Sequence, residues 1–121
     1  MKSENRNVGR LGEQLARQLL SDKGYQVIER NFGTKFGEID LIVKDGDILV
    51  FVEVKTKKGL DFGSPEEMFT KGKMQRVKRM AAVYLQGKET ETACRVDMVA
   101  VVLDNQNQPE RVTHYPNVVM W

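Results

Sequence analysis

The sequence predicts an α/β protein in which a mixed β-sheet, built around a central β-hairpin, is flanked by helices. Three observations lead to this prediction: an amphipathic stretch near the N-terminus, two aliphatic runs on either side of Asp45-Gly46, and a basic amphipathic stretch that precedes another apolar run. The 121 residues suit one domain spanning residues 1–121, because most domains contain about 100–150 residues.

The first predicted element is an amphipathic helix over residues 3–23. Its apolar side chains recur at steps of three and four residues and form one stripe: Val8, Leu11, Leu15, Ala16 and Leu19. Glu13 lies about 140° around the helix from Val8, at the edge of this stripe, so it can reach the rim of the surface on which the helix packs. Gly24 suits the C-terminal cap, and a strand over residues 25–32 follows.

Residues 37–55 carry the strongest structural signal in the chain. Asp45-Gly46 between two β-branched runs predicts a two-residue hairpin turn, with Asp40 opposite Phe51 and Glu38 opposite Glu53. One face is then entirely aliphatic and needs a covering helix; it holds Ile39, Leu41, Val43, Ile48, Val50, Val52 and Val54. The other face gathers polar side chains at one end, namely Glu38, Asp40, Glu53 and Lys55.

The remaining segments complete the α/β pattern. Ser64-Pro65-Glu66-Glu67 has the sequence of a capping box and predicts a short helix, and a second, basic helix is expected to end at Gly87. Residues 95–103 predict an interior strand because they are almost continuously apolar. Arg95 and Asp97 alternate onto one face of that strand and can form a structural ion pair. Residues 111–115 predict a last strand at an edge, in which the lone histidine, His114, is interpreted as structural.

Composition narrows the class of protein. A lone Cys94 excludes a disulfide framework within the chain and fits a reducing cytoplasm, and with only one histidine a cysteine-rich structural zinc site is excluded as well. No apolar run approaches the roughly 18 residues of a membrane helix, and the N-terminal segment is polar, unlike a secretory signal. We therefore expect a cytoplasmic protein with no membrane association.

Charge is distributed unevenly along the chain. Residues 55–79 contain eight basic and three acidic side chains, whereas the rest of the chain contains 11 basic and 14 acidic ones. This asymmetry favours a positive face that binds a polyanion, but a solvated, lysine-rich helix would give the same pattern. Charge alone leaves both interpretations open.

The polar end of the hairpin predicts a specific chemistry. Two carboxylates on neighbouring strands offer the hard oxygen ligands that Mg²⁺ or Mn²⁺ prefers, and a lysine two residues after the second can hold a water molecule and offset charge in the transition state. Asp40-x(12)-Glu53-x-Lys55 is therefore a sufficient set for phosphodiester hydrolysis. The alternative is a solvated strand edge with an ion pair between Glu53 and Lys55. A bound cation explains the converging carboxylates more simply, because their mutual repulsion needs compensation.

The same residues carry a family resemblance. Gly37-Glu38-Ile39-Asp40-Leu41-Ile42 followed by Phe51-Val52-Glu53-Val54-Lys55 resembles the PD-(D/E)XK nuclease superfamily, although Ile39 stands where the superfamily name has proline. More closely, the chain resembles the small bacterial YraN-like family, which is judged nuclease-like and related to archaeal Holliday junction resolvases. This likeness covers nearly the whole length and includes Gly12-Glu13, Arg30-Asn31, Phe62-Gly63-x-Pro65, Lys73 and Arg95-x-Asp97.

The resemblance implies a restriction-endonuclease-like core and a set of site residues. It implies that Asp40, Glu53 and the Val54 carbonyl ligate Mg²⁺ or Mn²⁺, that Lys55 positions the nucleophilic water, and that Glu13 approaches the metal. Lys73 would lie near the scissile strand, and Glu38 would tune the site. Since such enzymes pair two active sites on two strands, the resemblance also points to a homodimer and to branched or structured DNA as substrate.

We therefore predict a metal-dependent endonuclease-like protein that hydrolyses phosphodiester bonds in DNA. Backbone phosphates would be contacted by basic side chains after and beyond the hairpin, namely Lys57, Lys58, Lys73, Arg76, Lys78 and Arg79. Two alternatives remain: a nucleic-acid-binding module without catalysis, and a protein-interaction domain whose basic helix binds an acidic partner.

Overall fold

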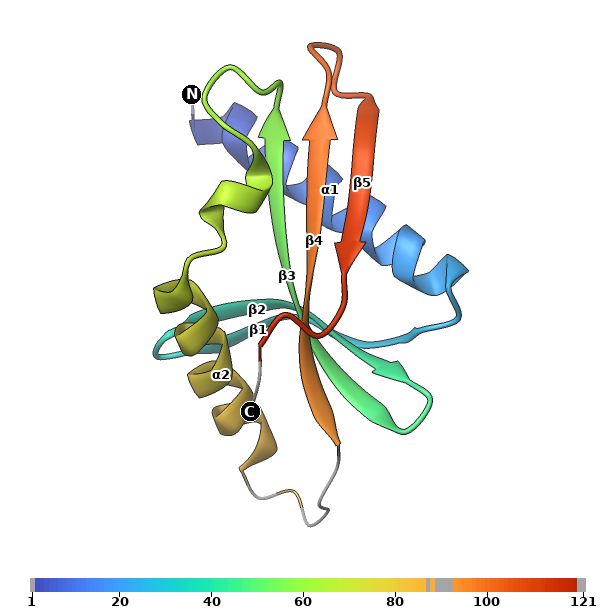
Figure 1. Ribbon diagram of the computed structural model, residues 1–121, viewed down its shortest axis with the longest axis vertical. Coiled ribbons are helices and arrows are strands. Elements are labelled where there is room, and N and C mark those ends of the chain that lie inside the picture. The colour runs from blue at the N-terminus through green and yellow to red at the C-terminus, as the bar shows by residue number, and fades with distance from the viewer. Residues whose placement is uncertain (1, 87, 89–92, 120–121) are drawn as a thin grey trace.

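The protein is α/β, as predicted, and consists of one five-stranded sheet with a helix on each side (Figure 1). The computed structural model describes residues 2–86, 88 and 93–119. In chain order the elements are α1 (Lys2–Asp22), β1 (Gln26–Thr34), β2 (Gly37–Asp45), β3 (Ile48–Lys58), the 3₁₀ helix η1 (Pro65–Met68), α2 (Lys71–Leu85), β4 (Cys94–Leu103) and β5 (Pro109–Tyr115). The predicted helix end at Gly87 lies outside the described residues.

The sheet is mixed because only its central pair of strands is parallel. Its order is β1-β2-β3-β4-β5, with β3 and β4 parallel and all other neighbours antiparallel. The parallel pair requires a crossover connection, which η1 and α2 supply. β4 is an interior strand, as its apolar run predicts, and β5 forms one edge.

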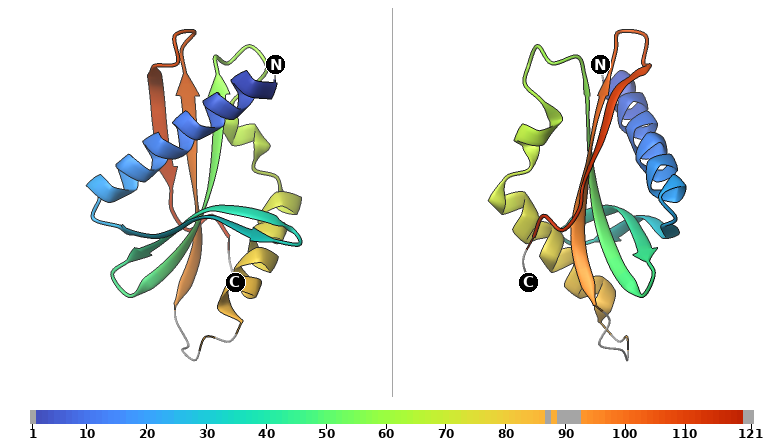
Figure 2. Two further views of the ribbon diagram at one scale, coloured as in Figure 1. Left: turned by 180° about the vertical axis from the view of Figure 1, so that it is seen from behind. Right: turned by 45° about the vertical axis from the view of Figure 1, so that its right-hand side comes forward.

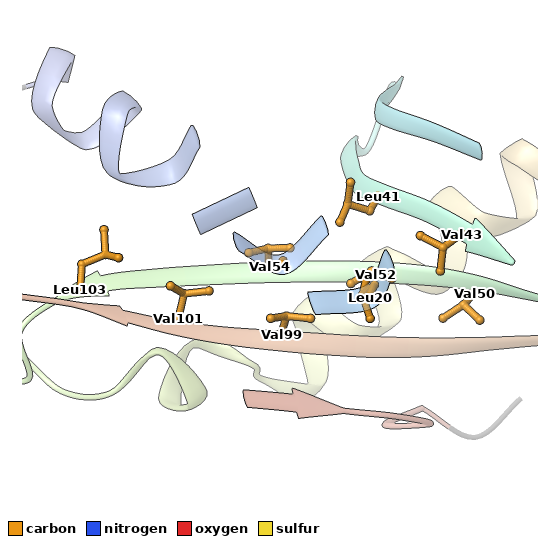
Figure 3. Packing of buried hydrophobic residues seen from close by; sticks show 10 residues of the cluster. Leu20, Leu41, Val43, Val50, Val52, Val54, Val99, Val101 and Leu103 are labelled. Carbon is orange, nitrogen blue, oxygen red and sulfur yellow. The ribbon is translucent and has the colours of Figure 1, made fainter. Parts of the chain in front are cut away.

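Each face of the sheet is covered by a helix, and each has its own hydrophobic core (Figure 2). On one face Ala16 and Leu20 of α1 pack against aliphatic side chains of β2, β3 and β4 (Figure 3). On the other face Val77 and Met80 of α2 pack around the fully buried Phe51. The amphipathic spacing of the sequence thus selects the buried side of both helices.

Helix α1 ends where the sequence predicts, in a Schellman motif around Gly24. The backbone amide of Tyr25 donates to the Leu20 carbonyl at 3.0 Å, and that of Gly24 donates to the Ser21 carbonyl at 2.9 Å. Gly24 has a φ of +91°, a conformation that glycine adopts without strain. Among the described residues, no helix is both long and apolar enough to cross a membrane.

The hairpin register differs from the prediction by two residues. Asp45 pairs with Ile48, so the turn residues are Gly46-Asp47. Gly46 takes a φ of +58° at the first turn position, where a type II′ turn requires glycine. The pairing of Asp40 with Phe51 and of Glu38 with Glu53 was therefore wrong. Because side chains alternate with a period of two, the shift leaves Glu53 and Lys55 on the predicted face.

One residue of the predicted aliphatic face packs on the other side of the sheet. Ile39 is fully buried in the core beneath α2, whereas Leu41 belongs to the core beneath α1. The cause is that β2 leaves β3 after the pair Leu41–Val52 and continues with β1 alone. Strict alternation holds only within a regular ladder, so the prediction for Ile39 was wrong.

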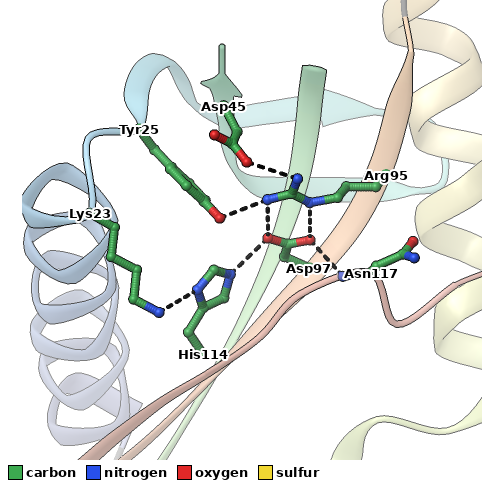
Figure 4. A network of polar contacts seen from close by, with 7 residues as sticks. All are labelled: Lys23, Tyr25, Asp45, Arg95, Asp97, His114 and Asn117. Carbon is green, nitrogen blue, oxygen red and sulfur yellow. Dashed lines mark hydrogen bonds and ion pairs between the residues drawn. The ribbon is translucent and has the colours of Figure 1, made fainter. Parts of the chain in front are cut away.

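A buried polar network joins β4 to β5 and to the start of β1 (Figure 4). Asp97 is fully buried and accepts hydrogen bonds from Arg95 Nε at 2.9 Å and from the backbone amide of Asn117 at 2.9 Å. Arg95 also reaches Asp45 at 2.9 Å and the Tyr25 hydroxyl at 2.7 Å. The predicted ion pair of Arg95 with Asp97 is thus confirmed, and it stabilises the junction of four strands.

His114 belongs to the same network, as its structural interpretation predicts. Its Nε2 lies 2.7 Å from Asp97 Oδ2, and its Nδ1 lies 2.9 Å from Lys23 Nζ. Because an ammonium group only donates, Nδ1 accepts and Nε2 carries the proton given to Asp97. Burial by itself raises the pKa of Asp97, but the bonds from His114 and Arg95 hold that pKa below its ordinary value.

Candidate active site

The candidate site lies at the fork where β2 and β3 separate. Beyond Leu41–Val52 the two strands no longer pair, so the backbone amide of Val54 lacks a partner on β2. The Asp40 carboxylate takes that place and accepts a hydrogen bond from Val54 at 2.7 Å. The side chain of Asp40 thus bridges the fork and faces the edge of β3.

The fork opens into a cavity of about 270 Å³ that brings most of the predicted site residues together. Acidic and basic side chains line it from three elements, namely Glu38, Asp40, Glu53, Lys55, Lys73 and Arg76. β2 and β3 supply the carboxylates and Lys55, whereas α2 supplies Lys73 and Arg76 from above. The central prediction that Asp40 and Glu53 face a common space is confirmed.

Both carboxylates are electrostatically stressed. Burial, followed by the negative charges of Glu53 and Glu13, raises the pKa of Asp40 to about 8, although the hydrogen bond from Val54 opposes the shift. Burial also raises the pKa of Glu53, and Lys55, whose Nζ lies 3.4 Å from Glu53 Oε1, counteracts that effect. Burial is thus the main cause of both shifts, and Arg76 and Lys73 join Lys55 in opposing it at Glu53.

A close contact between α1 and β3 positions Glu13 beside this fork. Gly12 packs directly on Thr56, and a Cβ atom at Gly12 would lie 1.7 Å from Thr56 Oγ1. Glycine is thus the residue that lets the helix approach the strand this closely. Glu13 follows in the chain, and its negative charge contributes to the raised pKa of Asp40.

Asn31 holds the Glu13 side chain, a role that the sequence did not reveal. Its Nδ2 donates to both carboxylate oxygens of Glu13, at 3.4 and 3.3 Å. Asn31 lies opposite Asp40, between the pairs Arg30–Leu41 and Phe32–Ile39, and has a φ of +52°. Asparagine tolerates this left-handed conformation better than most residues. The only sequence signal was Arg30-Asn31 within the family resemblance.

A longer groove of about 630 Å³ runs from the fork along β3. Its lining comes from α1, β3 and η1: Val8, Gly9, Glu13, Val54, Lys55, Thr56, Lys57, Lys58 and Met68. Lys55 lines both the groove and the fork cavity, so the two are neighbours. Residues 53–58 of β3 pair with β4 but not with β2, which leaves this strand edge open to a ligand.

The basic residues predicted to contact nucleic acid fall into separate places. Lys57 and Lys58 line the groove, and Lys73 and Arg76 line the fork cavity. Arg79 lines another cavity, of about 580 Å³, with Lys35 and with Phe36, which also lines the fork cavity. Lys78 is a half-buried residue of α2.

The donor atoms at the fork fit a hard divalent cation that retains water. No group of three or more His, Cys, Asp or Glu side chains suited to a metal occurs in the described part of the chain. The predicted oxygen donors are the carboxylates of Asp40 and Glu53 and the backbone carbonyl of Val54, and the carboxylate of Glu38 lines the same cavity. Mg²⁺ is commonly bound by one or two carboxylates, with water and substrate phosphate completing its octahedron. This set of donors therefore suits Mg²⁺ better than an ion whose ligands all come from the protein.

Comparison with known proteins places the chain in a family. The model of the uncharacterised protein family UPF0102 matches residues 12–101. A UPF0102 protein of Dictyoglomus turgidum is 40% identical over 114 residues, which cover 93% of this chain and 97% of that protein. One from Symbiobacterium thermophilum is 47% identical over 80% of this chain and 83% of its own length. One from Syntrophomonas wolfei is 51% identical over 67% and 70%, respectively. The chain therefore belongs to the UPF0102 family, the YraN family that its sequence motifs predict.

Proposed function

We propose that this protein is a metal-dependent endonuclease that hydrolyses phosphodiester bonds in DNA. The observation that carries the proposal is the convergence of Asp40 and Glu53 on one cavity with Lys55 beside them. The ionised forms of these two half-buried carboxylates are unfavourable in the free protein, because burial raises the pKa of each. A divalent cation bound between them would stabilise the ionised forms, and the resemblance to PD-(D/E)XK nucleases supports the same assignment.

Asp40, Glu53 and the Val54 carbonyl would hold the cation. When bound, Mg²⁺ or Mn²⁺ supplies Lewis-acid polarisation of a phosphoryl oxygen and lowers the pKa of water. Lys55 donates hydrogen bonds to the attacking water and holds it in line with the phosphorus. Its ammonium group also stabilises the negative charge that develops on the phosphate oxygens. Glu13, fixed by Asn31, orients water at the rim of the site.

The basic groove supports a nucleic acid strand as the substrate. A phosphodiester strand that follows the open edge of β3 would meet Lys57 and Lys58 and then reach Lys55 at the fork. Lys73 and Arg76 face the fork from α2 and would bind the phosphates next to the scissile one. Such contacts position a strand without reading its base sequence, so we expect little sequence preference.

Cleavage assays with Mn²⁺ or Mg²⁺ test the proposal. We expect the purified chain to cut at least one of four DNA substrates: linear, nicked, flapped or four-way junction. Asp40→Asn, Glu53→Gln and Lys55→Ala should each lower the rate by at least about 100-fold, because each removes a group that acts in the transition state. Asp47→Asn, in the exposed hairpin turn, is the matched control and should cut like the wild type.

Two results would separate this proposal from its alternatives. Salt-sensitive DNA binding without cleavage, and without carboxylate-dependent Mn²⁺ binding in calorimetry, would indicate a nucleic-acid-binding module. Absence of salt-dependent DNA binding would indicate a protein-interaction domain, since a protein that neutralises phosphates releases counterions and loses affinity steeply with salt.

A further inference from the structure

The loop that follows β3 presents an aromatic side chain to solvent. Phe62 is 93% exposed, and Leu60, two residues before it, is 54% exposed. The other exposed large apolar side chain among the described residues is Ile28 on β1, at 41%. We call residues 59–63 the Phe62 loop. A phenylalanine almost wholly in water is unfavourable for the free protein, which points to a partner that covers it.

The Phe62 loop is a built turn. Gly59 and Gly63 have φ values of +75° and +97°, and the backbone amide of Gly63 donates to the Leu60 carbonyl at 3.1 Å. A Cβ atom at Gly63 would lie 2.2 Å from Glu67 Oε2, so the Glu67 side chain fills the space beside it. That same oxygen accepts from the backbone amide of Ser64 at 3.0 Å. These contacts define the turn that carries Phe62 outward.

Both ends of the Phe62 loop are attached to the sheet. At its start, the backbone amide of Gly59 donates to the Leu103 carbonyl of β4 at 2.9 Å. After its end, Glu66 of η1 accepts two hydrogen bonds from the Arg111 guanidinium and one from the Tyr115 hydroxyl, the last at 2.7 Å. A bidentate pair of this kind fixes orientation as well as distance, so the exposed tip is held by β4 and β5.

The Phe62 loop directly follows the basic residues of the groove in the chain. Lys57 and Lys58 line the groove, and the Phe62 loop begins at the next residue, beside the end of β3 at the top of Figure 1. Phe62 follows Lys55 by seven positions in the chain, so the Cα atoms of the two residues lie at most about 25 Å apart. A strand bound along the groove would therefore meet Phe62 within about seven phosphate spacings of the fork.

We propose that the Phe62 loop is a wedge that inserts between DNA bases where their stacking is already interrupted, at a nick, a flap or a junction. This inference rests on the proposed nuclease function and names its substrate class. Apolar side chains inserted at a base step unstack it at an energetic cost, and that cost is smallest where stacking is already broken. The lysines of the groove bind any strand, whereas Phe62 stacks on a base that has lost its neighbour.

The test compares Phe62→Ala with the parent chain, each carrying Lys55→Ala so that bound DNA stays intact. Fluorescence anisotropy measures affinity for intact duplex, nicked duplex and a four-way junction, and 2-aminopurine next to the interruption reports unstacking. We expect Phe62→Ala to weaken binding to nicked and junction DNA by about tenfold, to change duplex binding less than about twofold, and to abolish the rise in 2-aminopurine fluorescence. Phe62→Trp should restore the affinity for nicked and junction DNA and the rise in 2-aminopurine fluorescence. Ile28→Ala is the control, because it also removes exposed apolar surface but on β1, and it should leave both quantities unchanged.

Cleavage mapping gives a second, independent measurement. With Lys55 intact and Mn²⁺ present, cuts should fall within about seven nucleotides of the interruption, and Phe62→Ala should scatter them. Melting temperatures of all variants should agree, because Phe62 is exposed.

Three outcomes would overturn the wedge. If the wild type cuts DNA, and Phe62→Ala binds each of the three DNAs as tightly as the parent chain does, the wedge is wrong and the nuclease proposal stands. If the parent chain binds no DNA, both proposals fail. If Phe62→Ala instead abolishes dimer formation in sedimentation, or binding to anionic phospholipid vesicles, while DNA binding is unchanged, the loop serves another partner.

Discussion

The Asp40 carboxylate accepts a hydrogen bond from the backbone amide of Val54 at 2.7 Å, across the fork between β2 and β3. This side chain thus has two roles. It accepts from the Val54 amide, which has no partner on β2 once the strands diverge, and it faces the cavity that Glu53 also lines. The geometry of the fork and the chemistry of the site depend on the same residue.

Substitutions of Asp40 should separate these two roles. Asp40→Asn keeps an oxygen that accepts from Val54, so we expect a folded protein that has lost Mn²⁺ binding and cleavage. Asp40→Ala leaves the Val54 amide unpaired and should cost about 1–3 kcal/mol in the free energy of unfolding. Urea denaturation of the two variants measures the difference. Equal stability of Asp40→Asn and Asp40→Ala would show that the hydrogen bond does not support the fork.

Metal binding should strengthen as pH rises through the raised pKa of Asp40, about 8. A cation must displace the proton that Asp40 retains at neutral pH, so Mn²⁺ should bind at least about tenfold more tightly at pH 8.5 than at pH 6.5. Calorimetry in two buffers of different ionisation enthalpy also measures the released proton.

The metal-free protein should show the opposite pH trend. A carboxyl whose pKa is raised on folding contributes stability that is full below its unfolded value, 3.8, and is lost as pH rises through about 8. Asp40→Asn should flatten this loss of melting temperature. For the metal-binding prediction above, an Mn²⁺ affinity that does not change with pH would show that Asp40 retains no proton at neutral pH.

Gly12→Ala should displace α1 from β3 at the point where Glu13 reaches the fork. The added methyl group overlaps Thr56, and overpacking of this kind commonly costs about 1–3 kcal/mol. Cleavage should fall as well, because Glu13 moves with the helix. Gly9→Ala is the matched control, since a Cβ atom at Gly9 meets nothing within 4 Å. The double variant Gly12→Ala, Thr56→Ala should recover part of the stability, as differential scanning fluorimetry would detect.

Asp97→Ala should lower the free energy of unfolding without changing the residues at the fork. It removes one of the two carboxylates that pair with Arg95 and leaves the buried His114 Nε2 and the Asn117 amide without their acceptor. Breaking a buried pair costs about 3–5 kcal/mol, whereas Asp47→Ala in the exposed turn should stay within about 0.5 kcal/mol of wild type. The pKa of Asp97 is lowered on folding, so its contribution is present above 3.8 and is lost as pH falls below that value. Acid titration of the variant should therefore show a smaller loss of stability below pH 4.

Lys57 and Arg79 should differ in the salt dependence of DNA binding. Lys57 lines the groove beside the open edge of β3, whereas Arg79 lines a different cavity, with Lys35. Lys57→Ala should reduce the slope of log affinity against log salt by about one, and Arg79→Ala should leave it unchanged. Anisotropy titrations at four salt concentrations measure both slopes. An equal reduction by both would mean that bound DNA also contacts the cavity lined by Lys35 and Arg79.

The sequence by itself predicted the elements, most of the buried faces and the candidate site residues, since these follow from local periodicity and motif spacing. Gly24 ends α1 and the apolar run of β4 lies inside the sheet because capping and hydrophobic patterning act over a few residues. The predicted face of Glu53 and Lys55 is correct despite a register error of two residues, because side chains of a strand alternate with a period of two.

Only the tertiary structure decided where the ladder between β2 and β3 stops. Ile39 crosses to the core beneath α2, Asp40 bonds to Val54, and Asn31 reaches Glu13 because the hairpin forks there. At this divergence Leu41 joins the core beneath α1 and Ile39 the core beneath α2, and no local pattern records it. Long-range packing, rather than propensity, therefore assembles the fork at which the carboxylates meet.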